Sequence, residues 1–383
     1  MARRAAVKPA PKRRVPVPRR SVDGMQQVTT TTSQSAGAAA SRAAPSANPS
    51  PLFALTNQYQ GAFALIAAVK LDLFSPLATQ PGSAKEVAAA RSLPVRGVER
   101  LLNAMAALQV VTKTHGTFAL SPAAAEFLVQ GQPHYIGSWI AERAKAIQAW
   151  ARLDEAVLAD KPLQAHSDDA VQQMSEADLE SYIGGLKQFA LTGPAFRLAE
   201  RLDLQDRHAL LDVGGGSGVY SCVLAQKNPQ TRFVVMDLAP VLAIAKRTVA
   251  EFGLERRVTL WEGDFKKTKF GNGYDAALLS NVLQTEGAAV AKKLIKKVFD
   301  ALNPGGVVAV HGIMTNKDGA GPAPSVLSGL MFLLFFPEGS AYTTDEYAGW
   351  LEAAGFVDVK VERMPTPSVY TLVTARKPNS STN

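Results

Sequence analysis

One short segment constrains the fold of this chain more than any other: residues 211–218 read Leu-Asp-Val-Gly-Gly-Gly-Ser-Gly. Apolar residues 209–213 lead into the glycines and a helix-compatible stretch, 219–227, follows them. The segment therefore predicts a strand, a tight turn and a helix. Glycines in such a turn let the backbone bend sharply and approach a ligand that a Cβ would keep away. In an open α/β sheet, ligands bind at this turn, beyond the carboxyl end of the strand.

The alternation of strand and helix continues to the end of the chain. After the glycine turn we expect strands at 233–236, 258–261, 274–279, 307–310, 356–361 and 370–375, and helices at 241–252, 288–302 and 344–354. Alternation of this kind predicts an α/β domain with a doubly wound, mostly parallel sheet and helices on both of its faces.

The sequence upstream of residue 201 divides into three further parts. Residues 1–50 are rich in Ala, Arg, Pro, Ser and Thr, and we expect a disordered basic tail, because this composition buries too little apolar surface to offset its ordering entropy. Residues 51–133 are expected to form a small N-terminal domain, and residues 134–200 a helical linker. Residues 201–379 then hold the predicted α/β domain.

The N-terminal domain follows the order of a winged helix. Ser83 and Glu86 form a capping-box pair at the start of one helix, a second helix is expected at 96–108, and a hairpin follows. Winged helices often bind DNA, but the second helix offers few basic side chains, so packing or dimerisation is favoured. The net charge of +8 does not favour DNA binding by this domain. Residues 1–20 carry eight Lys and Arg and no acid, so the net charge of residues 21–383 is 8 minus 8, or zero.

The basic tail is open to several interpretations. It could bind phosphates, acidic lipids or an import receptor, or be a solvated extension, and Met25 could be the true start. The single cysteine, Cys222, excludes an internal disulfide, and we expect an inert buried thiol in a cytoplasmic protein. The longest apolar run, 327–336, is too short to span a membrane, so no span is expected.

Acidic residues follow the first three strands of the predicted sheet, where a ligand would lie. Asp212 precedes the glycines, Asp237 ends the second strand, and Asp264 with Phe265 follows the third. Val219 breaks the dinucleotide fingerprint, so a phosphate-bearing ligand is disfavoured. Asp212 could meet a ligand ammonium and Asp237 both hydroxyls of a ribose. Asp264 could bind the amine of an adenine that lies against Phe265, so the pattern predicts a site for S-adenosylmethionine (SAM).

Five motifs resemble the SAM-dependent O-methyltransferases that include plant caffeic-acid-type and bacterial natural-product enzymes. They are Leu211-Asp-Val-Gly-Gly-Gly-Ser-Gly, Val235-Met-Asp-Leu-Ala-Pro, Gly263-Asp-Phe, Leu279-Ser-Asn-Val-Leu and Leu302-Asn-Pro-Gly-Gly. The resemblance, over about residues 51–377, implies a class I methyltransferase fold, a small-molecule acceptor and a homodimer built on a dimerisation winged helix. It also implies that Gly214, Gly216, Leu238 and Ser280 join the aspartates in the SAM site.

The sequence departs from that family where the catalytic residues are expected. The resemblance places a histidine base at position 284, where this chain has Gln284, and places supporting acids at Gly312 and near Ala341. A glutamine amide does not accept a proton at neutral pH, so we assign Gln284 to substrate placement. Glu286 and His311 are the candidates for a displaced base, although a packed strand histidine also explains His311.

Three interpretations follow from this departure. In the first, the enzyme methylates an acceptor that needs little help from a base, such as an acidic phenol, an enol or a nucleophilic carbon. In the second, a displaced base removes the proton of a hydroxyl, with Glu338 as a further candidate. In the third, the fold binds SAM without transferring a methyl group. An apolar pocket for a flat or hydrophobic acceptor is expected from Met314, Met331, Phe332 and Phe335. No metal site and no specific nucleic-acid partner are predicted.

Overall fold

The computed structural model describes residues 46–163, 165–365 and 368–379. The predicted disordered tail falls almost wholly on residues 1–45, outside the described residues. Two helices, α1 (Ser50–Asn57) and α2 (Tyr59–Lys70), follow. Together they cover Ser50–Lys70, a segment long and apolar enough to cross a membrane by length and composition alone. The expectation that the chain has no membrane span therefore stays a prediction.

Residues 75–120 combine short helices with a three-stranded sheet. The elements are α3 (Ser75–Thr79), β1 (Gly82–Ser83), α4 (Ala84–Ala90), α5 (Val95–Ala107), β2 (Val111–Thr114) and β3 (Thr117–Leu120). The capping box at the start of α4 is confirmed, since Ser83 Oγ accepts from the Glu86 N–H at 3.3 Å and Glu86 Oε2 accepts from the Ser83 N–H at 2.6 Å. The predicted hairpin is confirmed as the antiparallel pair β2 and β3. The winged-helix assignment stays a prediction.

The region predicted as a linker is helical. After α6 (Pro122–Phe127), which still belongs to the predicted N-terminal domain, it holds α7 (Gly137–Trp150), α8 (Leu153–Ala159), α9 (Asp168–Gln173), α10 (Glu176–Leu191) and α11 (Pro194–Arg201). The short helix α9 begins after Ser167, whose Oγ caps it by accepting from the Ala170 N–H at 3.2 Å. Trp139 on α7 stacks on Phe189 on α10 with ring centroids 5.2 Å apart, which ties these two helices together.

The rest of the chain forms a seven-stranded sheet in the order β6-β5-β4-β7-β8-β10-β9. Its strands are β4 (Ala209–Val213), β5 (Arg232–Asp237), β6 (Val258–Glu262), β7 (Tyr274–Ser280), β8 (Leu302–Ile313), β9 (Val357–Arg363) and β10 (Tyr370–Arg376). The first five strands are parallel, and β10 runs antiparallel to β8 and β9. The prediction of a doubly wound, mostly parallel sheet is confirmed.

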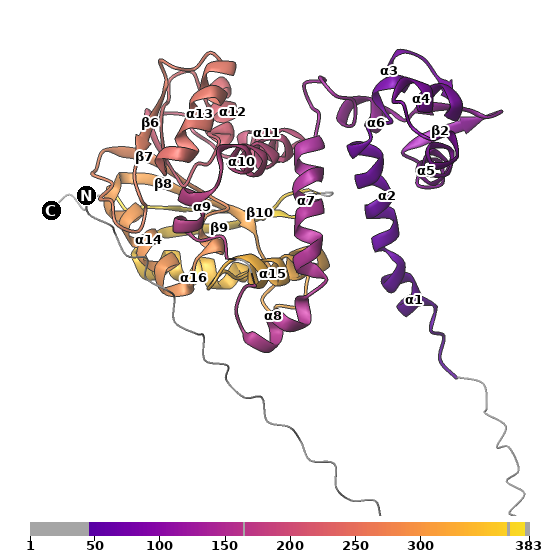
Figure 1. Ribbon diagram of the computed structural model, residues 1–383. Coiled ribbons are helices and arrows are strands. Elements are labelled where there is room, and N and C mark those ends of the chain that lie inside the picture. The colour runs from indigo at the N-terminus through magenta and orange to yellow at the C-terminus, as the bar shows by residue number, and fades with distance from the viewer. Residues whose placement is uncertain (1–45, 164, 366–367, 380–383) are drawn as a thin grey trace, which may run out of the picture. The chain divides into compact units, whose positions relative to one another are not determined.

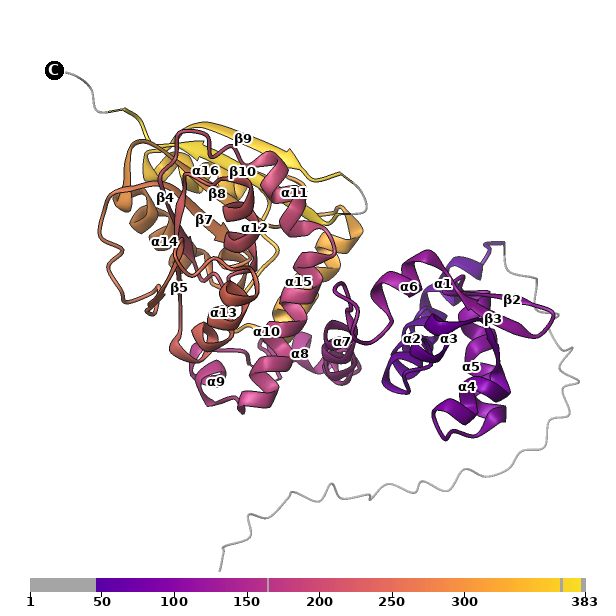
Figure 2. The same ribbon diagram turned by 90° about the horizontal axis from the view of Figure 1, so that it is seen from above.

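Helices cover both faces of this sheet. Helices α12 (Val219–Lys227) and α13 (Ala239–Glu251) lie on one face, and α14 (Ala288–Ala301) and α16 (Thr344–Ala354) on the other (Figures 1 and 2). Successive residues of a strand point to opposite faces. Leu210 accordingly packs in the cluster with α12 and α13, and Leu211 packs in the cluster with α14 and α16, both fully buried.

The strand order also fixes where a ligand would bind. From β4 the chain proceeds outward through β5 and β6 on one side, then returns to build β7 and β8 on the other side. The carboxyl ends of β4 and β7 therefore flank the point where the order reverses, which is the ligand-binding edge of an open α/β sheet. The glycine turn of residues 214–218 lies at this edge.

Candidate active site

A cavity of about 1060 Å³ opens at the carboxyl ends of the central parallel strands. Asp212, Asp237 and Ser280, at the ends of β4, β5 and β7, line one part of it. Side chains from α7, α10 and α15 (Ala323–Phe335) line the other part. Small-molecule sites commonly enclose about 300–1,000 Å³. This cavity therefore offers room for a cofactor and an acceptor side by side.

The glycine turn fits only glycine at its tightest points. Gly214 and Gly216 have φ angles of 66° and 58°, in the left-handed region that other residues rarely adopt. A Cβ on Gly215 would lie 2.7 Å from Val235 Cγ1 and 2.8 Å from Asp212 Oδ2. The loop thus brings bare backbone to the cavity wall directly beside the Asp212 carboxylate.

Asp212 is a buried carboxyl group with one oxygen left without a partner. It is 1% exposed, and its Oδ2 accepts from Ser221 Oγ at 2.6 Å. Its Oδ1 is buried and has no hydrogen-bond partner among the described residues. Burial raises the pKa of Asp212 to about 7; the Ser221 hydrogen bond opposes this rise and the nearby Asp237 charge adds to it. A cationic ligand group would satisfy Oδ1 and favour the carboxylate, which suits the positively charged SAM.

Asp237 is held at the cavity wall by backbone hydrogen bonds. Its Oδ2 accepts from the Gly216 N–H at 2.8 Å, and its Oδ1 accepts from the Leu238 N–H at 2.7 Å. Leu238 is the N-cap residue of α13, and it lines the cavity as well. The carboxylate therefore ties the glycine turn after β4 to the end of β5.

Asp264 and Phe265 lie on the loop after β6. Asp264 Oδ1 accepts from the Lys266 N–H at 2.8 Å, and Oδ2 pairs with Lys267 Nζ at 2.9 Å. Burial opposes ionisation of Asp264, but these contacts with the two lysines outweigh it and lower its pKa. All the residues expected to bind the cofactor line this one cavity, namely Asp212, Gly214, Gly216, Asp237, Leu238, Asp264, Phe265 and Ser280.

Gln284 also lines the cavity, on the short 3-10 helix η1 (Leu283–Thr285). It is 5% exposed. Its Oε1 accepts from the Ile313 N–H at 3.0 Å, and its Nε2 donates to Asn281 Oδ1 at 3.2 Å. A Cβ on Gly312 would lie 2.7 Å from Gln284 Oε1. The missing side chain at position 312 therefore leaves the space that the glutamine amide fills.

His311 lies behind the cavity wall. It is 1% exposed and is not among the residues that line the cavity. Its Nδ1 lies 3.0 Å from Ser280 Oγ, and its ring stacks on Tyr370 with centroids 4.7 Å apart. Burial, aided by the charge of Arg197, lowers the pKa of His311 to about 3. This geometry does not fit a base that touches the acceptor, and it fits the alternative of a packed strand histidine.

The two acidic candidates for a base both line the cavity. Glu286 has a side chain that is 13% exposed, and its carboxylate pairs with Lys266 Nζ at 2.9 Å. Glu338 lies nearby, because a Cβ on Gly287 would lie 2.2 Å from its Oε2. A role for either carboxylate as a base stays a prediction.

Of the four residues expected in the acceptor pocket, three line the cavity and one does not. Met331, Phe332 and Phe335, all on α15, line the cavity. Met314 is fully buried in the core cluster that α14 and α16 share and does not line the cavity. Ile313 lines it instead. The error arises because adjacent residues of an extended chain point to opposite sides.

Several cavity residues escaped the sequence analysis because they lie in the presumed linker. They are Trp139, Arg143, His166 and Tyr182. His166 stacks on Phe335 with ring centroids 5.1 Å apart, and burial lowers its pKa. The sequence signalled only an aromatic-rich helical segment here. Nothing in its spacing indicated that these helices line the carboxyl edge of the sheet.

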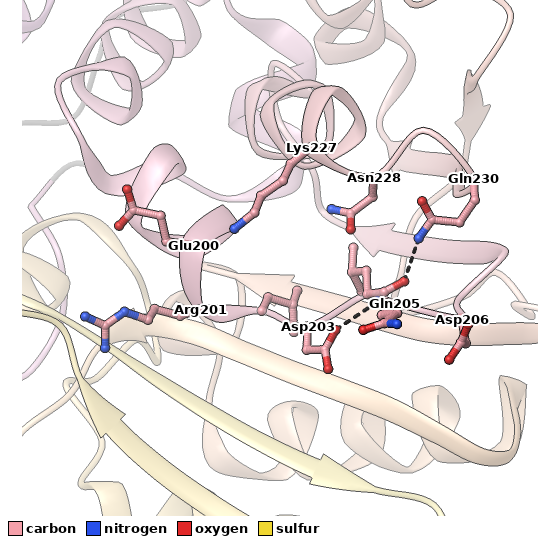
Figure 3. Close-up of a pocket in the computed structure, with 10 residues that line it drawn as sticks. Glu200, Arg201, Asp203, Gln205, Asp206, Lys227, Asn228 and Gln230 are labelled. Atoms are coloured by element: carbon pink, nitrogen blue, oxygen red, sulfur yellow. Dashed lines mark hydrogen bonds between the residues drawn. The ribbon is translucent and has the colours of Figure 1, made fainter.

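A second hollow, of about 480 Å³, lies at the opposite, amino-terminal edge of the sheet (Figure 3). Its polar groups bind the protein itself: Gln230 Nε2 donates to the Leu204 carbonyl at 2.9 Å and Lys227 Nζ to the Ala199 carbonyl at 2.7 Å. It is open and lies away from the edge where ligands bind to such sheets. The cavity around Asp212 is therefore the candidate active site.

Gly312→Ala is expected to lower the free energy of unfolding by about 1–3 kcal/mol, because the new methyl group displaces Gln284 Oε1 and leaves the Ile313 N–H without this acceptor. In a Gln284→Ala background the methyl group meets no amide, so the same substitution should cost less. Equilibrium urea unfolding of both single variants and the double variant measures this coupling. Equal costs in the two backgrounds would show that the positions are independent.

Comparison with known proteins agrees with this geometry. The O-methyltransferase domain model matches residues 170–357, and the O-methyltransferase dimerisation domain model matches residues 53–130. The chain is 32% identical over 315 residues to 3-hydroxy-5-methyl-1-naphthoate 3-O-methyltransferase of Streptomyces sahachiroi, which covers 82% of this chain and 91% of that relative. It is 29% identical over 344 residues to the N,N-dimethyltransferase OxyT of Streptomyces rimosus, covering 88% and 98%. Its fold matches human N-acetylserotonin methyltransferase in complex with SAM, with a TM-score of 0.79 at 23% identity, over 88% of this chain and 100% of that one.

Proposed function

Because this chain belongs to the O-methyltransferase family and is a SAM-dependent methyltransferase, we propose that it methylates a hydroxyl group of a small aromatic acceptor. The observation that carries the proposal is a single cavity that joins a buried, half-partnered carboxylate to an aromatic wall. The relative from Streptomyces sahachiroi is named for methylating a hydroxyl of a naphthoate. The relative OxyT is named for dimethylating nitrogen, so the hydroxyl is the part of the proposal that most needs a test.

We assign the cofactor half of the cavity to residues at the strand ends. SAM, when bound, supplies a methyl group already activated by a positive sulfur. Asp212 would hold the positively charged part of the cofactor, and the unpartnered Oδ1 supports this role. Asp237 would accept hydrogen bonds from the ribose hydroxyls. Asp264 and Phe265 would hold the adenine.

The acceptor half is lined by aromatic side chains from the helices. Trp139 comes from α7, Tyr182 from α10, and Phe332 and Phe335 from α15. Flat rings pack favourably against such side chains in offset or edge-on arrangements. A planar aromatic acceptor therefore fits this wall better than a branched aliphatic one.

Gln284 would place the acceptor rather than take its proton. An amide nitrogen carries two hydrogens, and Asn281 Oδ1 accepts one from Gln284 Nε2. The other can donate to an acceptor oxygen. Orientation of two reactants can contribute about 7–11 kcal/mol to lowering a barrier. A general base accelerates such a reaction by about 10²–10⁴-fold, or about 3–5 kcal/mol, which is less than orientation contributes. An acidic acceptor is already ionised and needs little help from a base, so orientation by Gln284 would be enough for it.

The chain carries a dimerisation domain, which indicates a homodimer. We propose that the protein is a cytoplasmic homodimer in which a second copy covers the exposed apolar side chains of residues 54–70. Leu55 is 63% exposed, and Tyr59 and Phe63 are 57% and 47% exposed. We also propose that residues 51–133 form the dimerisation domain, that 134–200 supply part of the acceptor wall, and that 201–379 bind SAM and supply the rest of that wall from α15.

The test of the proposed function uses the purified full-length chain with SAM and a panel of hydroxyarenes. We expect S-adenosylhomocysteine (SAH) to form together with an O-methylated product that mass spectrometry and NMR identify. Gln284→Ala should lower kcat while leaving the Kd for SAM unchanged. A product methylated on nitrogen or carbon would overturn the hydroxyl assignment. No SAH formation with any hydroxyarene would overturn the proposed function.

A further inference from the structure

A cationic side chain lines the cavity without an acidic partner. Arg143 on α7 places its guanidinium over the Trp139 ring, 5.4 Å from the ring centroid, and Nη1 lies 3.6 Å from Met331 Sδ. Its Nε is buried and has no hydrogen-bond partner in the described part of the chain. Within that part, no carboxylate forms an ion pair with this guanidinium, although Lys145 on the same helix is paired with two carboxylates.

The nearest acid on the same helix is engaged elsewhere. Glu142 Oε1 pairs with Lys145 Nζ at 2.9 Å and accepts from Ser181 Oγ. Lys145 also pairs with Asp178, at 3.2 Å. Lys145 thus pairs with both Glu142 on α7 and Asp178 on α10. Arg143 is left facing a wall of aromatic rings and a thioether.

An arginine in this setting calls for an anion that none of the described residues provides. Charged side chains are rarely buried unless paired, because the lost hydration is not otherwise replaced. Burial lowers the pKa of Arg143, but a guanidinium stays protonated in proteins, so the charge persists. Its planar fork of N–H donors matches a carboxylate in a bidentate arrangement.

We propose that Arg143 binds a carboxylate on the acceptor, so that the substrate class is a hydroxyaryl carboxylic acid. The inference rests on the proposed function, since it concerns the acceptor half of the same cavity. Trp139, His166 and Phe335 surround the aryl ring, and the charge of Arg143 fixes which end of the molecule enters first. Arg143 is thus a specificity-determining residue, and the hydroxyl to be methylated is selected by its position relative to the carboxylate.

The test measures binding rather than turnover. Hydroxyaryl carboxylic acids of one, two and three rings, including 3-hydroxy-1-naphthoate, and their carboxamides are titrated by calorimetry into the full-length protein saturated with SAH. We expect at least one acid to bind the wild type tenfold or more tighter than its amide. Arg143→Met should abolish that preference, and Arg143→Lys should keep part of it. Lys145→Met, which removes a paired cation from the same helix and cavity, should leave it intact.

Three results would overturn the inference: equal binding of every acid and its amide to the wild type, a preference that survives in Arg143→Met, or no binding of any acid in the panel. Circular dichroism and an unchanged Kd for SAH show that each variant is folded. The experiment measures acceptor binding to the SAH-saturated protein and not methyl transfer. Loss of the preference for the acid can therefore be distinguished from failure of the proposed function. In the latter case, SAH would not form from SAM with any acceptor.

Discussion

Asp237→Ala is expected to weaken SAM binding by about 100-fold or more. The Asp237 carboxylate holds the Gly216 and Leu238 N–H groups at 2.8 and 2.7 Å, so its loss frees the glycine turn and removes the acceptor for the ribose. Hydrogen bonds to charged groups contribute about 1.5–3 kcal/mol each, and the loss of two of them gives a factor of this size. Isothermal titration calorimetry with the purified variant measures the change.

The control for this substitution lies across the same cavity. Gln284→Ala removes a cavity side chain of the acceptor half, and it should leave the Kd for SAM within about twofold, since the amide binds Asn281 and the Ile313 N–H rather than the glycine turn. An equal loss of SAM affinity in both variants would contradict the division of the cavity into cofactor and acceptor halves.

SAM binding is expected to weaken as the pH falls, by about 30-fold between pH 8 and pH 5.5. Burial raises the pKa of Asp212 to about 7, so the carboxyl is ionised at pH 8 and mostly protonated at pH 5.5. A cationic ligand binds the ionised form, and each pH unit below the pKa lowers the ionised fraction, and with it the affinity, about tenfold. Calorimetric titrations at pH 8, 7, 6 and 5.5 test the slope.

Asp212→Asn supplies the matched comparison, because it keeps the size of the side chain and cannot ionise. It should bind SAM weakly at every pH, with a flat profile. A wild-type affinity that does not change with pH, or a variant with the wild-type slope, would contradict the role of Asp212.

The stability of the ligand-free protein should change with pH in the sense opposite to affinity. Between the ordinary pKa of an aspartate and about 7, the folded state keeps a proton on Asp212 that the unfolded state has lost. This carboxyl therefore favours folding at low pH, and its contribution is lost as the pH rises toward 7. Urea unfolding of the wild type against Asp212→Asn at pH 5 and pH 8 isolates this contribution, which the asparagine variant lacks.

The sheet and its cofactor edge could be predicted from the sequence because both depend on local pattern. Strand β4 and helix α12 have the predicted bounds, since apolar runs broken by glycine leave few other ways to fold. Asp212, Asp237 and Asp264 lie at or just beyond the carboxyl ends of β4, β5 and β6, and parallel strands bring these ends to a common edge. The spacing alone was enough to gather these three residues in one cavity.

The acceptor half could not be predicted in the same way, because it depends on contacts between segments far apart in sequence. Arg143 contacts Met331, 188 residues later, and His166 stacks on Phe335. No periodicity in the 134–200 region encodes those contacts. Whether Met314 or Ile313 faces the cavity depends on the direction of the side chains at the end of β8, and the resemblance does not give that direction.

The match between Gln284 and Gly312 required coordinates as well. The resemblance implies a histidine at position 284 and an acid at position 312, and the sequence has Gln284 and Gly312 there, which the sequence alone presents as two separate departures. The structure joins them, since Gln284 Oε1 occupies the space that a side chain at position 312 would fill. Gln284 and Gly312 are therefore complementary, because the glycine leaves the space in which the glutamine amide binds.

The most direct test of a SAM site between Asp212 and Asp237 is a crystal structure of the protein with SAH. We expect a positively charged nitrogen of the ligand within hydrogen-bond distance of Asp212 Oδ1, directly or through one water, and both ribose hydroxyls on the Asp237 carboxylate. SAH bound anywhere else, or bound here with Asp212 Oδ1 still lacking a partner, would contradict the assignment.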